Sequence, residues 1–406
     1  MRKRDAGWLG LVGLFAAFAL VVGACSSGGD DSADEPEPAS GGDAAPAEDV
    51  TLEGPIVLGA LAPLSGAAGS VGEENVRGSQ FAVDEANAAG GVLGAEVELI
   101  EVDTMADPAV AGPAAQRLIT EDDATALLGP VSSSAAAAVA ETATRDEVPM
   151  VAYNAGAEAV TDIGSEFVFR TYPTVQNAYA ALGEYAVEEL GYETFGFIGW
   201  SEIAGTAAVE GLEEGLDAAG GELVSDPELL PITATDFSGP ISTIMGEDPD
   251  AVVLAAPPPS AGAAARQIRE AGWDVPLLGW VGFTGSAGFR AIAGADTVQG
   301  MVMASAWHPD AASPGVGEDF VEAFTAQEGR PPTDLEALGY DAARIALTGI
   351  EAAGSTDGPA IAAAIHDLEY EGVKAVFVWD ESGEVEHPLW IVAWEGDEHI
   401  LLDELG

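Results

Sequence analysis

Short β-rich runs alternate with helical segments along this chain from residue 55 onward. Ile56–Leu61 is an unbroken apolar run, which is typical of a strand buried on both faces. Gly72–Ala89 follows with Val76 and Val83 on one helical face, and a pair of glycines ends the segment. Because strands and helices keep alternating, the sequence predicts an α/β fold with doubly wound parallel sheets covered on both faces.

The alternation continues through most of the chain. Further strands are expected over residues 97–102, 126–128, 148–153, 194–200, 223–230, 251–256, 276–280 and 300–305, and 373–402 is strand-rich. Further helices are expected over residues 108–120, 132–145, 175–190, 206–219, 237–245, 260–271, 286–293, 317–328 and 334–353. About 350 residues are too many for one ordinary core and predict two lobes. Since ligands bind beyond the carboxyl ends of such strands, the strand-to-helix loops are the candidate site.

The N-terminal region predicts export from the cytoplasm. A basic start, Arg2–Arg4, precedes the apolar run Gly7–Val22, and small residues lead into Cys25. The apolar run is too short for a convincing spanning helix, so residues 1–24 are predicted to be a signal peptide. Cys25 is the only cysteine, and its place resembles the lipidated cysteine of bacterial lipoproteins; an ordinary signal peptide with an incidental cysteine is the alternative. Residues 25–53 lack large apolar side chains and predict a disordered acidic tether.

The charge balance excludes nucleic acid as a partner. The formal net charge is −56, and the chain holds two lysines, Lys3 and Lys374. Nucleic-acid binding needs basic patches, which this composition does not supply. The acids are spread along the whole chain, which favours a solubility adaptation of the surface to saline conditions. A binder of cationic solutes is the alternative.

Three consecutive serines form the strongest candidate binding loop. Ser132, Ser133 and Ser134 follow an expected strand and open an expected helix. Hydroxyls and free backbone amides then meet at a helix N-terminus, which favours an anion such as a carboxylate. A plain helix cap is the alternative, because serine is a usual cap residue.

Other strand ends supply weaker candidates. They are Asn154, Ala155, Gly156, Trp200, Ser260 and Trp280. The first three form a small loop that can bring amides to the same anion, although an ordinary loop has the same composition. The two tryptophans can cover the apolar part of a ligand or pack in the core. Ser260 follows three prolines and is either a helix cap or a ligand contact.

The sequence contains no catalytic or metal-binding constellation. Its four histidines are scattered without the spacing of metal ligands, and it has no nucleophile elbow and no phosphate-binding glycine–lysine loop. We therefore expect a binding protein rather than an enzyme, with no cofactor and no metal.

Several short stretches together carry a family resemblance. They are Ile56–Gly66, Gly78–Gly94, Gly129–Ser134, Phe169–Thr171, Thr235–Ser238, Arg266–Gly272 and Tyr340–Ala342. In order and spacing, over nearly all of residues 55–402, they resemble the Leu/Ile/Val-type (branched-chain amino acid) binding proteins of ABC importers. The resemblance implies a type I periplasmic binding protein fold, in which three crossovers join two lobes that close on a ligand. It implies a first lobe of residues 55–172 and 283–386 and a second lobe of 173–282 and 387–406.

The resemblance also implies a function and partners. The protein would capture a small amino acid or a related carboxylate or amide outside the cytoplasm, and it would deliver it to a permease with ATPase subunits. A lipid on Cys25 would be its only attachment to the membrane. A ligand-sensing receptor domain of the same fold and, with less support, an enzyme of the cleft are the alternatives.

Single residues match or depart from the family's binding site. Ser133 matches the serine that grips the ligand carboxylate, and Gly156 stands where the family has a threonine. Ser260 stands where the family has the acid that pairs with the ligand ammonium. Either Glu158 or Glu202 replaces that acid, or the ligand is an amide, a urea-like solute or a carboxylate without an amine, since an unpaired buried ammonium is costly.

Two family aromatic positions are small in this chain. One falls at Val71 and the other near Ala204.

Overall fold

The computed structural model of the protein describes residues 50–380, 382–385 and 387–405. Cys25, the predicted signal peptide and residues 25–49 of the predicted tether lie outside these residues. Leu52, inside the predicted tether, packs against the first lobe, and its N–H donates to the Leu93 carbonyl at 3.1 Å. Among the described helices, none combines the length and the apolar character needed to cross a membrane.

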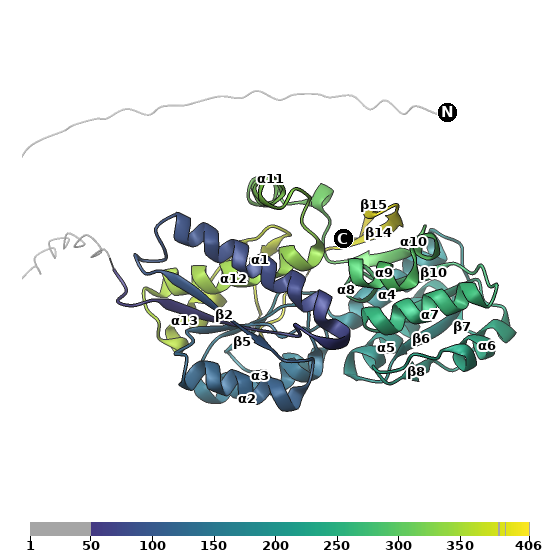
Figure 1. Cartoon of the computed structure of the whole chain (residues 1–406), viewed down its shortest axis with the longest axis horizontal. Coiled ribbons are helices and arrows are strands. Elements are labelled where there is room, and N and C mark those ends of the chain that lie inside the picture. Colours follow the sequence, from purple (N-terminus) through teal and green to yellow (C-terminus); the bar gives the residue numbers. More distant parts are fainter. Residues whose placement is uncertain (1–49, 381, 386, 406) are drawn as a thin grey trace, which may run out of the picture. The chain divides into compact units, whose positions relative to one another are not determined.

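Five parallel strands form the sheet of the first lobe in the order β2-β1-β3-β4-β5 (Figure 1). The strands are β1 (Ile56–Ala62), β2 (Val97–Asp103), β3 (Ala126–Leu128), β4 (Met150–Ala152) and β5 (Val168–Arg170). The helices around them are α1 (Gly69–Ala88), α2 (Pro108–Thr120), α3 (Ser133–Asp146), α12 (Asp334–Ala353) and α13 (Gly358–His366). Ile56 and Leu58 of β1 pack in one core with α1, α12 and α13, while Val57 and Leu61 pack in another with α2 and α3. Helices therefore cover both faces, as the alternation predicts.

Eight strands form the sheet of the second lobe, in the order β15-β14-β11-β10-β9-β6-β7, with β8 also paired to β6. They are β6 (Thr194–Trp200), β7 (Glu222–Leu223), β8 (Glu228–Leu230), β9 (Ala251–Ala255), β10 (Leu277–Trp280), β11 (Val302–Ser305), β14 (Leu389–Glu395) and β15 (Glu398–Leu405). Its helices are α4 (Val175–Glu188), α5 (Ile203–Ala219), α6 (Ser238–Glu247), α7 (Pro258–Glu270), α8 (Val281–Thr284), α9 (Ala287–Ala293) and α10 (Ala295–Val298). Strands β6 to β11 run parallel, and β14 and β15 form an antiparallel edge.

The first lobe is completed by segments from the C-terminal half of the chain. They are η3 (Pro309–Ala311), α11 (Val316–Glu328), β12 (Tyr370–Glu371) and β13 (Val376–Phe377), besides the 3-10 turns η1 (Gly66–Ala68) and η2 (Glu158–Val160) earlier in the chain. Helices α1 and α12 approach each other closely. A Cβ on Gly78 would lie 1.9 Å from the Glu336 carbonyl oxygen, and one on Gly339 would lie 1.8 Å from that of Asn75. Only glycine permits this contact of the two helices.

The division of the lobes differs from the expected one between residues 283 and 305. Strand β11 pairs in parallel with β10, and Phe289 of α9 packs in the core of the second lobe. The expectation that residues 283–386 belong to the first lobe is therefore wrong for this part. The physical reason is that β11 fills the place between β10 and β14, where its four residues are buried.

Three segments join the lobes: residues 171–174 after β5, residues 306–308 after β11, and the segment between β13 and β14. The loop between β12 and β13 braces two of them. Lys374 Nζ donates to the Thr171 carbonyl at 2.8 Å, and Trp307 Nε1 donates to the Val373 carbonyl at 3.2 Å. The first two crossovers are thus fixed to the first lobe by buried hydrogen bonds.

Candidate functional site

The three serines lie at the N-terminus of α3, after the carboxyl end of β3. Ser132 is the N-cap residue, but its side chain makes no capping bond to the helix and instead lies 3.1 Å from the Ser134 hydroxyl. Ser133 Oγ accepts from the Ala157 N–H at 3.2 Å, so its own O–H is available to donate. The first-turn amides have no acceptor within the helix. This turn therefore offers several donors to an anion.

The loop after β4 lies beside the serine turn. The Asn154 and Gly156 residues face the cavity, whereas Ala155 does not, and its carbonyl accepts from Arg170 at 2.5 Å. A Cβ on Gly156 would lie 3.1 Å from Trp280 Cη2. Val175 Cγ2 would lie closer still, at 2.9 Å, so these two side chains leave little room for a residue larger than glycine.

Aromatic rings form the opposite side of the site. Tyr172, in the first crossover, stacks on Trp280 with ring centroids 4.7 Å apart and an interplanar angle of 9°. Phe283 meets Trp280 and Trp200 edge-on, at 6.1 Å and 6.4 Å. Burial raises the pKa of the Tyr172 phenol well above its ordinary value, so this group is neutral.

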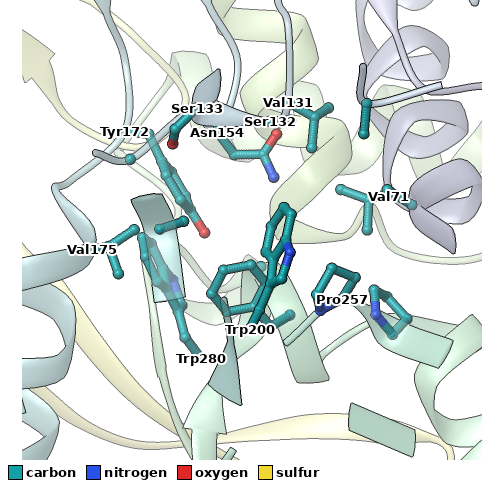
Figure 2. Close-up of a pocket in the computed structure, with 17 residues that line it drawn as sticks. Val71, Val131, Ser132, Ser133, Asn154, Tyr172, Val175, Trp200, Pro257 and Trp280 are labelled. Atoms are coloured by element: carbon teal, nitrogen blue, oxygen red, sulfur yellow. The ribbon is translucent and has the colours of Figure 1, made fainter. Parts of the chain in front are cut away.

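A narrow cavity lies between the two walls, with about 40 Å³ of space that the centre of a water-sized sphere can reach. Figure 2 shows Ser132, Ser133 and Asn154 on one side of it and Trp200 and Trp280 on the other. It is lined by Ala68, Val71, Ala106, Val131, Ser132, Ser133, Asn154, Gly156, Tyr172, Val175, Trp200, Ala204, Pro257, Pro258, Trp280, Gly282 and Phe283. The carboxyl ends of strands in the two lobes therefore meet at one cavity, as expected for parallel sheets.

The lining of this cavity carries no charge among the residues that the structure describes. Glu158 and Glu202, the two candidates for pairing with an ammonium, do not line it. Ser260 is also outside the lining, and its hydroxyl donates to the Ile232 carbonyl at 2.8 Å. The described part of the chain also holds no group of three or more side chains suited to a metal ion.

Four polar atoms around the cavity are buried without a partner. They are Asn154 Oδ1, Tyr172 Oη, Trp200 Nε1 and Trp280 Nε1; none makes a hydrogen bond of good geometry to another described residue, although Tyr172 Oη and Trp280 Nε1 lie near each other. Each such buried group costs about 1–3 kcal/mol when it stays unpaired. A bound molecule that reaches these atoms would therefore supply hydrogen bonds that the described residues do not make.

The structure brings six of the nine predicted site residues to the cavity and leaves out Ser134, Ala155 and Ser260. Val71 and Ala204 also line it. Tyr172 and Phe283 were not predicted. Tyr172 follows a three-residue strand that ends in the charged Arg170, and Phe283 lies in a helix of only four residues.

Comparison with known sequences identifies the family. Residues 55–398 match the family described as periplasmic binding protein. The Leu/Ile/Val-binding protein homolog 3 of Brucella melitensis is 26% identical over 351 residues, which are 86% of this chain and 94% of the relative.

Solved structures agree with this. The leucine binding protein LivK of Thermotoga maritima has a TM-score of 0.81 and 27% identity, covering 86% of this chain and 98% of that one. A solute binding protein of an ABC transporter from R. palustris, in complex with benzoate, has a TM-score of 0.78 and 23% identity over 86% and 96% of the two chains, which shows a common fold. With the family match over most of its length and two α/β lobes around one cavity, this chain belongs to the periplasmic binding protein family, which binds solutes and is not enzymatic.

Proposed function

We propose that this protein is the solute-binding component of an ABC importer and captures a small carboxylate that carries no amine. One observation carries the proposal: the cavity combines donors at a helix start with a lining that has no acidic side chain among the described residues. The donors can hydrogen-bond a negatively charged group, and the described lining has no carboxylate to pair with a positively charged one.

The serine turn would hold the carboxylate. Ser133 can donate its hydroxyl proton while its oxygen keeps the bond from Ala157, and the first-turn amides of α3 add main-chain donors. Hydrogen bonds to a charged group are worth about 1.5–3 kcal/mol each. The positive end of the helix dipole adds to this, which favours a carboxylate over an amide or a urea-like solute.

The neutral lining disfavours an α-amino acid. A buried ammonium without a carboxylate partner costs several kcal/mol. Similar solved structures hold isoleucine in one protein and benzoate in another, so the fold accommodates solutes with and without an amine. The names of the relatives favour a branched-chain amino acid, which is therefore the second candidate.

Capture would work by closure of the lobes. The cavity is built from both lobes, so a solute that touches the serine turn and the aromatic wall stabilises the closed form over the open one. The permease would then recognise that form.

Calorimetric titration with leucine and with 4-methylpentanoate tests the proposal, since the two differ only in the α-ammonium group. We expect 4-methylpentanoate to bind at least about tenfold more tightly, because the ammonium gains no partner. Ser133→Ala should weaken this binding, whereas Ser260→Ala, which removes a hydroxyl outside the cavity, should leave it unchanged.

Tighter binding of leucine would instead support the amino acid candidate. Binding that survives Ser133→Ala at full strength would remove the serine turn from the site.

We also propose that the protein acts outside the cytoplasm on a lipid anchor at Cys25, a residue outside the described part of the chain. Cys25→Ser should move the protein from the membrane fraction to the soluble fraction of cells that express it.

A further inference from the structure

The two tryptophans of the cavity differ from most other buried tryptophans of this protein. Trp200 is 7% exposed and Trp280 is 2% exposed, and neither indole N–H makes a hydrogen bond of good geometry to residues 50–380, 382–385 or 387–405, although the Tyr172 hydroxyl lies near the Trp280 N–H. By contrast, Trp307, Trp379 and Trp394 each donate to a main-chain carbonyl at 2.9–3.2 Å.

An indole N–H restricts what can satisfy it. It is a donor only, so it needs an acceptor and gains nothing from a hydrocarbon or from an ammonium group. Two such donors lie in one wall without a well-formed hydrogen bond, and the Tyr172 hydroxyl near Trp280 also lacks one. A solute with a purely apolar tail would leave them unpaired inside the closed cleft, and this costs binding energy.

The position of the two indoles determines which end of the solute they would contact. In Figure 2, Trp200 and Trp280 lie across the cavity from Ser132 and Ser133. A solute whose carboxylate rests on the serine turn therefore turns its other end toward the indoles. Between the two ends the lining is mainly apolar, with Val71, Val131 and Val175 among its residues.

From these contacts we propose that the solute carries, at the end opposite its carboxylate, a neutral oxygen that accepts hydrogen bonds from Trp200 and Trp280. A hydroxyl, an ether or a carbonyl oxygen fits this description. A second carboxylate does not, because the described lining holds no cation to offset it. The inference rests on the proposed function, since it takes the carboxylate end as given.

Two matched pairs of acids test the inference by calorimetric titration of the full chain. 4-Methoxybenzoate and 4-ethylbenzoate differ by an oxygen in place of a methylene group, as do 5-methoxypentanoate and heptanoate. In at least one pair the oxygen-bearing acid should bind about tenfold more tightly or better, because only it pairs the indole donors.

Tryptophan variants show where that preference arises. Trp280→Phe and Trp200→Phe keep an aromatic ring and remove the N–H, so each should bring the affinity ratio within the pair toward one. The ratio is the measured quantity because a change in packing affects both acids alike. Trp390→Phe is the matched control: this indole in β14 is also buried and unpaired but lies outside the cavity, so the ratio should stay as in the parent.

The outcomes separate this inference from the proposed function. Equal affinities within both pairs, or a ratio that neither cavity variant changes, would overturn the oxygen acceptor while carboxylate capture stands. If none of the four acids binds, the inference and the carboxylate proposal both fail.

Discussion

At the scale of single residues, Arg170 stands out because it is fully buried at the end of β5. Its guanidinium donates to the carbonyls of Ala155 and Ala157 at 2.5 Å and 2.8 Å and to the side chains of Thr161 and Glu384, both at 2.9 Å. The two carbonyls flank Gly156, so Arg170 positions the loop that lines the cavity and ties it to the third crossover. The planar, forked guanidinium suits several acceptors at once.

Replacing Arg170 by lysine should disturb both stability and binding. A lysine keeps the charge but cannot reach all four acceptors, so we expect the free energy of unfolding to fall by about 2–4 kcal/mol. Affinity for the preferred carboxylate should fall as well. Denaturant unfolding and titration measure the two effects. Arg145→Lys, on the surface, is the control and should change neither; an Arg170→Lys protein with parent stability and affinity would contradict the assigned role.

Sequence reasoning finds residues at the ends of recognisable strands and misses the others. Ser133, Trp200 and Trp280 follow or end predicted strands, so their place at the sheet edge could be foreseen. Tyr172 could not, because β5 has only three residues and one is the charged Arg170. Whether a side chain fits at Gly156 depends on the distance of this residue from Val175 and Trp280 in the second lobe. No sequence pattern within one lobe gives that distance.

At the scale of elements, several long periodic segments and the short strand β3 were predictable, and other short elements were not. The bounds of α2, β3, β6 and α12 are confirmed residue for residue. The strand expected over residues 223–230 is two short strands that pair with opposite ends of β6. Helix α13 was not predicted at all, because its nine residues carry few large apolar side chains.

The packing of α1 on α12 predicts a dependence of stability on pH. Burial and the nearby Glu336 raise the pKa of Glu74 from 4.5 to about 7, although Thr333 donates to it at 2.9 Å. A raised pKa in the folded state means that the folded protein binds this proton more tightly than the unfolded one. The stability due to Glu74 is therefore present below about pH 4.5 and is lost as the pH rises through about 7.

Removing this carboxylate should stabilise the protein only where it is charged. Glu74→Gln should raise the free energy of unfolding by about 1–2 kcal/mol at pH 8 and change it little at pH 4.5. Denaturant unfolding at the two pH values measures the difference. Glu73→Gln, its exposed neighbour on α1, is the control. An equal gain for Glu74→Gln at both pH values would show that the carboxylate acts through packing rather than charge.

At the scale of the whole molecule, the sequence predicts two lobes from chain length and alternation, but it misplaces the return to the first lobe. The chain returns only after β11, because β11 pairs with β10 in the second sheet. The sequence of residues 300–305 predicts a strand but does not indicate which of the two sheets that strand joins. The net charge of −56 also acts at this scale, because repulsion among acids spread over the surface opposes the compact state.

Salt should therefore stabilise the protein. Raising the ionic strength from about 0.1 M to about 1 M shortens the screening length from roughly 10 Å to roughly 3 Å, which weakens this repulsion. We expect the melting temperature to rise by several degrees in sodium chloride. Thermal unfolding in sucrose of equal osmolality separates screening from solute exclusion. A rise of the same size in sucrose would assign the effect to exclusion instead.

The buried lysine has a practical consequence. Lys374 is the only lysine of residues 50–405, it is 3% exposed, and its amine is bound to the first crossover. Acylating reagents thus find no lysine on the described surface, and modification at this position requires the segments around it to part. The rate at which a mild acylating agent labels Lys374 would then report how often the segments that join the lobes separate.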